Sequence, residues 1–257
     1  MKDIAILMPC WKSPELLKVS IPSLVKSSTL DTEIVVILNE ADNESIAYLN
    51  LIGIKHIDLE VNLGPSAVDI AIPYIQERFQ YVANVNSDMA FSYGWDESLI
   101  NLMKMNGRST TSACLVEPVA NQHSVHLFLG EFTKAGLHEE FNQLVTAGKT
   151  KTNQSISYNH PIVTTMSDFI KVGGYSDNID PAWVVLGGRG LDDYFAWRLW
   201  SAYGGNYKFL KSDNSFVYHG VSLNSKKLMV RESGRNTFHA KTGISIDEFR
   251  ERIGYPH

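Results

Sequence analysis

The sequence predicts an α/β fold in which helices flank a mostly parallel central sheet. The continuous apolar run at 4–8 and the mostly apolar run at 33–38 indicate buried strands, a third strand is expected at 54–59, and a fourth begins at Tyr81. Such runs are typical of strands buried on both faces of a parallel sheet. Segments with helix signals separate them, and the resulting β-α-β-α-β-α-β order favours right-handed crossovers between parallel strands. With 257 residues and no clean linker, the whole chain, 1–257, is expected to form a single domain.

Turn residues end each of the first three strands. The first strand stops at Pro9-Cys10-Trp11, and Ser13 followed by Pro14 is typical of a helix N-cap and first helical residue. The second strand ends at Asn39-Glu40. Further helices are expected at 45–51 and 66–78, the latter after a turn at 61–65.

The stretch Tyr81–Phe91 is the first candidate for a functional site. It starts with strand-forming residues and breaks at Asn86-Ser87-Asp88, three short polar residues that favour turns. A carboxylate at the carboxyl end of a buried strand lies where open α/β sheets bind ligands. The alternative is that this tripeptide only turns the chain into the next helix.

The remainder of the chain supplies further elements and candidates. Two acids, Asp192 and Asp193, open a predicted helix that runs to Ala202, although acids at a helix start are often only partners of its dipole. His219 ends a predicted strand and could equally be structural. The other expected elements are a helix to about 105, strands at 111–116, 156–158, 162–164, 207–210 and 215–220, a variable insertion at 121–150, a short helix at 168–175, and a basic tail with a capping-box helix start at 245–248.

Composition excludes several classes of protein. A net charge of −5 and a pI near 5.9 give no general attraction to nucleic acid or anionic membrane. Two distant cysteines indicate neither a disulfide framework nor a zinc site, and fit a reducing cytoplasm. No signal peptide is visible, and no apolar run approaches the roughly 18 residues of a membrane-spanning helix. The first strand is followed neither by a Rossmann glycine motif nor by a P-loop.

Taken together, these motifs resemble those of the family 2 glycosyltransferases, which have the GT-A fold. The resemblance runs from about Ile4 to Ser222. It consists of the first strand and its Pro9, Asn62-Leu63-Gly64, Asn86-Ser87-Asp88 in the place of D-x-D, Gly94-Trp95, Gly173-Gly174-Tyr175, the helix start 191–198, and Tyr218-His219. The chain departs from the pattern at three places, because Asn86 replaces the first acid of D-x-D, Leu191 replaces a glutamate, and Asn39-Glu40 replace an aspartate of the second strand.

The resemblance implies an inverting, divalent-metal-dependent glycosyltransferase, transferring a hexosyl or pentosyl group from a nucleotide-diphosphate sugar to an acceptor hydroxyl. Asp88 and His219 would hold Mn²⁺ or Mg²⁺, which suits an oxygen and an imidazole ligand. Asp192 would be the catalytic base, or Asp193 if the register slips by one. The expected donor-binding residues are Pro9, Trp11, Asn39, Glu40, Asn62, Gly64, Asn86, Ser87 and Asp88.

The resemblance divides the chain into a nucleotide-sugar-binding half at 1–118, an acceptor-binding and catalytic half at 119–222, and a C-terminal basic tail and helix at 223–257. The acceptor could be a glycan, a lipid-linked sugar, a protein or another hydroxyl, and the acidic balance argues against nucleic acid. A second hypothesis, favoured by Asn86 and Leu191, is a catalytically inactive GT-A domain that binds a glycan or a partner.

Overall fold

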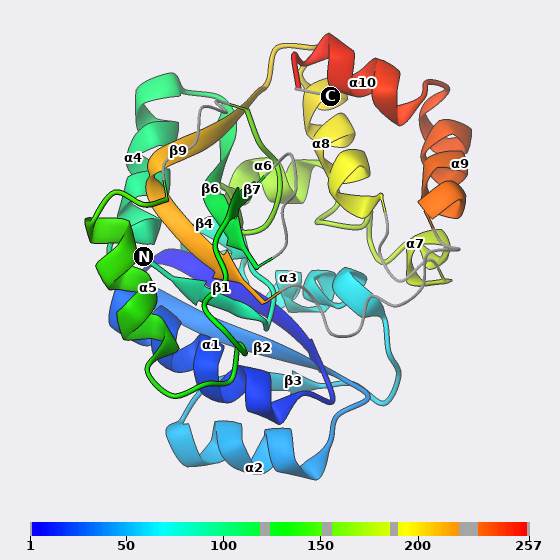
Figure 1. Ribbon diagram of the computed structural model, residues 1–257. Helices are drawn as coiled ribbons and strands as arrows, with labels where there is room; N and C mark the ends of the chain where they lie inside the picture. The colour runs from blue at the N-terminus through cyan, green and yellow to red at the C-terminus, as the bar shows by residue number, and fades with distance from the viewer. Residues whose placement is uncertain (1, 119–123, 151–155, 186–189, 221–230, 256–257) are drawn as a thin grey trace.

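The computed structural model describes residues 2–118, 124–150, 156–185, 190–220 and 231–255. Its centre is a nine-stranded sheet in the order β3-β2-β1-β4-β8-β6-β9-β5, with β7 paired to β6 (Figure 1). Helices cover both faces of this sheet. The architecture is therefore the predicted α/β fold with a mostly parallel sheet.

The first half of the chain builds the parallel part of the sheet. Its strand β1 pairs in parallel with β2 and β4, and β2 pairs in parallel with β3. The elements are β1 (Lys2–Trp11), α1 (Pro14–Ser27), β2 (Thr32–Asn39), α2 (Asn43–Ile52), β3 (Lys55–Asp58), the 3₁₀ helix η1 (Gly64–Ala71), α3 (Ile72–Ile75) and β4 (Phe79–Asn84). The type of one predicted helix is wrong. The expected helix at 66–78 is a 3₁₀ helix followed by a single α-helical turn, since Pro73 has no backbone N–H to continue an α-helical ladder.

The second half adds strands of both directions. Here β8 lies antiparallel between β4 and β6, while β5 pairs antiparallel with β9. The elements are β5 (Met89–Phe91), α4 (Trp95–Asn106), β6 (Ser109–Glu117), β7 (Ser124–His126), α5 (Leu137–Thr146), β8 (Ile162–Thr165), α6 (Met166–Lys171), α7 (Pro181–Val185), α8 (Leu191–Ala202), β9 (Lys208–His219), α9 (Arg231–Thr242) and α10 (Ile246–Arg252).

Two further expectations need correction, and one helix was not expected. The strands expected at 207–210 and 215–220 are one long strand, β9, whose register with β6 shifts between Ser112 and Cys114. Residues 156–158 form no strand, and Tyr158 instead packs among aromatic rings of β9, α10 and the segment after it. Helix α9 was not expected, because its sequence is polar and contains a glycine.

Alternate residues of β1 enter two different cores, as expected of a strand covered on both faces. Ile4 and Ile6 pack with residues of α1 and α4. Ala5 and Leu7 belong to a second core, which reaches α6, α8, α9 and α10. Figure 1 shows the last three of these helices grouped together, away from α1 and α2. In the part of the chain that the structure describes, no helix has the length and apolar character needed to cross a membrane.

Candidate active site

The break between β4 and β5 carries Asp88 to the carboxyl end of the sheet. Because Met89 of β5 lies opposite His219 of β9, the preceding Asp88 meets the imidazole of that strand. Asp88 Oδ1 lies 3.3 Å from His219 Nε2, and the Gly220 amide donates to the Asp88 carbonyl oxygen at 2.8 Å. The structure therefore brings together the two side chains that were predicted as metal ligands.

Glu117 completes this cluster. It ends β6, and its Oε1 lies 2.8 Å from His219 Nδ1. Burial alone would lower the pKa of His219, but the carboxylates of Asp88 and Glu117 outweigh burial and raise this pKa to about 10. Burial raises the pKa of Asp88, and the nearby His219 more than offsets this and holds the pKa below its ordinary value. Sequence reasoning missed Glu117, although it directly follows the strand predicted at 111–116.

This donor set fits a divalent cation only in part. One carboxylate and one imidazole converge, and the carboxylate on the second ring nitrogen is the usual outer partner of a metal-binding histidine. Among the described residues, no group of three or more His, Cys, Asp or Glu side chains is arranged as a complete metal centre. A cation here would need ligands from a substrate, as Mg²⁺ commonly takes them from phosphates.

Asp192 lies at the first turn of α8 with its side chain 38% exposed. Its Oδ1 accepts a hydrogen bond from the Tyr175 hydroxyl. His160 Nδ1 lies 3.9 Å from the same oxygen. An exposed carboxylate held from behind by a hydroxyl is suited to accept a proton from a bound molecule.

Asp193 has different surroundings. It is buried, and Tyr158 donates to its Oδ1 at 2.6 Å. Arg250 of α10 forks onto both oxygens, with Nε 2.9 Å from Oδ1 and one terminal nitrogen 3.2 Å from Oδ2. Burial lowers the pKa of Arg250, but the Asp193 carboxylate more than compensates and raises it. The contacts of Asp193 are thus internal to the protein.

His160 lies between the two groups of acids and was not singled out from the sequence. Burial lowers the pKa of His160, with smaller effects from the charges of Asp192, His219 and Asp88. Its side chain is 12% exposed and packs edge-on against Tyr175, with ring centroids 5.3 Å apart. No local motif marks this residue, because only the fold places it beside α8.

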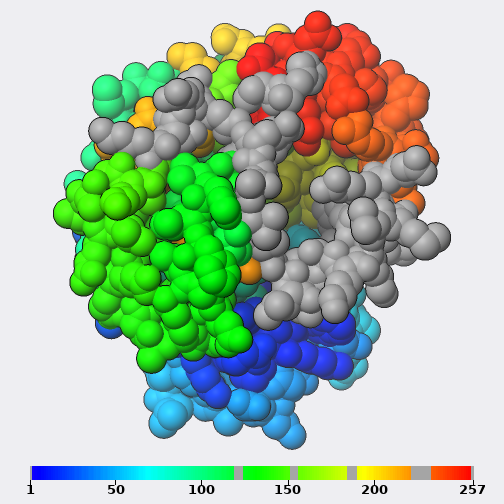
Figure 2. All heavy atoms as spheres, in the orientation of Figure 1, coloured from blue at the N-terminus to red at the C-terminus, as the bar shows by residue number. Residues whose placement is uncertain are grey.

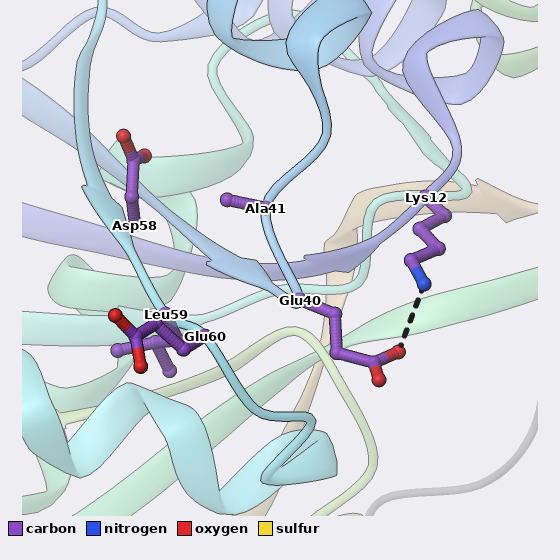
Figure 3. A pocket seen from close by; sticks show the side chains of 6 residues that line it. All are labelled: Lys12, Glu40, Ala41, Asp58, Leu59 and Glu60. Atoms are coloured by element: carbon purple, nitrogen blue, oxygen red, sulfur yellow. Dashed lines mark ion pairs between the residues drawn. The ribbon is translucent and has the colours of Figure 1, made fainter.

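The ends of β1 and β2 form a separate part of the site. Trp11 Nε1 donates to Glu40 Oε2 at 2.6 Å, and Lys12 Nζ lies 3.2 Å from the same oxygen. Figure 3 shows this ion pair at a cavity of about 480 Å³ that is lined by Lys12, Glu40, Ala41, Asp58, Leu59 and Glu60. Trp11 is 45% exposed, so its side chain is accessible to a bound molecule. The predicted neighbours Trp11 and Glu40 are therefore in contact.

The other predicted donor-binding residues lie at the carboxyl ends of β1, β2 and β4 and in the turn before η1. The buried Asn39 amide accepts from Leu63 N at 2.9 Å and donates to the Gly64 carbonyl at 3.2 Å. Asn62 accepts from Gly64 N at 2.8 Å. Pro9, Asn86 and Ser87 are half-buried at the same end of the sheet, and the Ser87 carbonyl accepts from Ser20.

The basic tail is only partly described. Arg235 pairs with Asp247, and Lys241 pairs with Asp180. Lys226 and Lys227 lie outside the described residues. Figure 2 shows residues 1–50 (blue) in the lower part of the molecule and the segment around α5 (green) to the left. Helices α9 and α10 (orange to red) lie at the upper right, and the visible surface is hollowed between these three parts.

Comparison with known proteins gives a consistent result. The model of the family described as "Glycosyl transferase family 2" matches residues 5–161, more than half of the chain. A search of curated protein sequences found no significant match.

Solved structures of S. aureus TarS share the fold. A TarS structure superposes with a TM-score of 0.62 over 98% of this chain at 10% identity, and the chain spans only 42% of that protein. The TarS fragment 1–349 gives TM-scores of 0.64 alone and 0.62 in complex with UDP, at 9% and 10% identity, again over 98% of this chain and over 70% of the fragment.

Proposed function

Because this chain belongs to glycosyl transferase family 2, we propose that its site transfers a sugar from a nucleoside diphosphate, with inversion, to an acceptor hydroxyl. The observation that carries the proposal is the convergence of Asp88 and His219 at one end of the sheet, with the exposed Asp192 on the adjoining helix start. His160 lies 3.9 Å from Asp192, and the charges of Asp88 and His219 also act on its pKa, which supports treating these residues as one site.

The diphosphate end of the donor is assigned to Asp88 and His219. A Mn²⁺ or Mg²⁺ ion held there would stabilise the negative charge that develops on the departing diphosphate. Glu117 supports the assignment, because it fixes the orientation of the His219 ring through Nδ1 and leaves Nε2 directed at Asp88. Asp88 and His219 would thus supply two ligands to the metal ion, and oxygens of the substrate would complete its coordination.

Asp192 is proposed as the base that takes the proton of the acceptor hydroxyl. The alternative, Asp193, is buried and its two oxygens are engaged by Tyr158 and Arg250, so an acceptor has no access to it. Asp192 lies in the first turn of α8 with its side chain 38% exposed, so an acceptor can reach it. Attack on the face of the sugar opposite the diphosphate inverts the anomeric configuration.

The nucleoside is placed at the cavity beside Trp11 and Glu40, where the ring can stack on a base. The similar TarS fragment was solved with UDP, which makes a uridine diphosphate sugar the first donor to test. The acceptor stays open among glycans, lipid-linked sugars and other hydroxyl compounds. A cytoplasmic location also stays a prediction, consistent with the two buried free thiols.

Thermal unfolding with UDP, in the presence and absence of Mn²⁺, tests the donor assignment. At a ligand concentration 100 times its Kd, binding stabilises the folded state by about 2.7 kcal/mol. In a chain of this size that raises Tm by roughly 5–10 °C. Asp88→Asn should remove the Mn²⁺-dependent part of this shift, while the exposed Asp213→Asn, also at a strand of this sheet, should retain it.

Sugar transfer and donor hydrolysis test the catalytic assignment. Asp192→Asn should lower turnover at least about 100-fold, as expected for loss of a general base, while UDP binding persists. Retention of near-wild-type turnover by Asp192→Asn would show that another group is the base. Absence of turnover of any nucleotide sugar by the wild type, despite UDP binding, would favour a binding module.

A further inference from the structure

The turn between α6 and α7 is fixed from two sides by buried charged groups. On one side, the Asp69 carboxylate of η1 accepts from the backbone amides of Tyr175 at 2.6 Å and Ser176 at 2.8 Å, and from the Ser176 hydroxyl at 2.6 Å. On the other side, the Arg198 guanidinium of α8 donates to the carbonyls of Val172 and Tyr175. The backbone of Tyr175 is thus held by η1 and α8 together.

Gly174 makes this arrangement possible. Its φ of +79° lies in the left-handed region, and a Cβ there would stand 2.8 Å from Asp69 Cγ and collide with Ile72. Any other residue would separate the turn from η1. The Gly173-Gly174-Tyr175 turn, Asp69 and Arg198 therefore act together to fix the position of the Tyr175 side chain.

The Tyr175 ring points from this turn to the start of α8. It is buried, and its hydroxyl donates to Asp192 Oδ1. Burial and the neighbouring Asp192 raise the pKa of Tyr175 well above its ordinary value, so the hydroxyl keeps its proton and can only donate toward the carboxylate. The Tyr175 ring also packs against Phe195 of the same helix, with centroids 5.2 Å apart.

We infer that Tyr175 is a positioning residue for the transfer reaction: its hydroxyl occupies one oxygen of Asp192 and orients the other toward the acceptor. This inference rests on the proposed role of Asp192 as the base. Buried, hydrogen-bonded neighbours are what hold a reacting group within the small tolerance that catalysis allows. The buried Tyr175 thus acts through Asp192 rather than as a catalytic residue itself.

The neighbouring residue of α8, Asp193, provides a matched control. Tyr158 is an equally buried tyrosine that donates to the neighbouring Asp193, which has no proposed role in the chemistry. Tyr175→Phe and Tyr158→Phe each remove one hydroxyl and one hydrogen bond to an aspartate of the first turn of α8, and Tyr158→Phe also removes the hydrogen bond that its hydroxyl accepts from Arg250 Nε. A purely structural effect would appear in both variants.

The test is to measure kcat, the donor KM and Tm for both variants. We expect Tyr175→Phe to lower kcat roughly 10–100-fold with the donor KM within about twofold, since misplacing a reacting group costs up to about 100-fold. We expect Tyr158→Phe to lower Tm and to leave kcat within about twofold of the wild type. In an Asp192→Asn background, Tyr175→Phe should cause no further loss of kcat, because its effect passes through the absent carboxylate.

Other outcomes separate this inference from the proposed function. If Asp192→Asn is inactive but Tyr175→Phe keeps wild-type kcat, Tyr175 does not position the base and only the inference fails. If Tyr175→Phe fails to fold, or if both tyrosine variants lose kcat equally, the hydroxyl is structural and the inference is overturned. If Asp192→Asn stays active, the proposed base itself is wrong.

Discussion

The ion pair between Asp193 and Arg250 joins α8 to α10, and replacing Arg250 by alanine should destabilise the fold strongly. The Asp193 side chain is 9% exposed and the Arg250 side chain 26%. Removing one partner of a buried pair leaves an uncompensated charge and costs about 3–5 kcal/mol. Since Arg250 retains some exposure, the lower end of this range, about 3 kcal/mol, is expected. With a urea m-value of about 3 kcal/mol/M, the midpoint should fall by about 1 M.

Equilibrium urea unfolding at pH 7, followed by circular dichroism and tryptophan fluorescence, measures this change. Arg252→Ala is the matched control, because Arg252 lies on the same helix in a surface pair with Glu248 whose side chains are 47% and 45% exposed. Such pairs contribute about 0–1 kcal/mol. In the Arg250→Ala background, Asp193→Asn should recover part of the loss by removing the unpaired charge. A loss for Arg250→Ala no larger than that for Arg252→Ala would refute this reasoning.

Two further predictions concern groups outside the site. Burial lowers the pKa of His138 in the folded protein. The unfolded chain therefore takes up a proton at this imidazole as the pH falls through about 6.5, before the folded protein does. This imidazole therefore lowers stability as the pH falls from about 7.5 to 5.5, whereas His219, whose pKa is raised to about 10, acts in the opposite direction. The wild type should thus lose stability relative to His138→Gln over this range, and identical pH profiles of unfolding for the two proteins would exclude the assignment. Burial also raises the pKa of Cys10 and of Cys114 to about 11. Both thiols should react with Ellman's reagent at pH 8 only in urea, and rapid modification of the native protein would contradict the burial of one of them.

The sequence was informative where local patterns determine structure. Apolar runs located the buried strands β1 and β2, and the Ser245 side chain caps α10 by accepting from Glu248 N at 3.1 Å, as the capping signal predicted. The family and the α/β GT-A fold suggested by the motifs are confirmed. The assignments of individual site residues stay predictions, although the structure places Asp88 next to His219 as those assignments require.

The missed features are those that depend on pairing between distant segments. Nothing near His160 marks it as part of a site, because its neighbours come from α8 and from the ends of β5 and β9. Likewise, the choice between Asp192 and Asp193 cannot be made from adjacent residues in a sequence. It depends on Arg250, which lies 57 residues after Asp193 and reaches it only through the packing of α10.

That separation also has a consequence for biosynthesis. The parallel strands of the first half are synthesised early and pair with near neighbours, so this part of the sheet can form while translation continues. The helix that bears Asp192 and Asp193 emerges much later, and its buried carboxylate stays uncompensated until Arg250 has left the ribosome. Nascent chains stalled before Arg250 should therefore hold α8 open to proteases, and chains stalled well beyond it should protect this helix. The packing of α10 against α8 would then complete the fold after the parallel strands of the first half have paired.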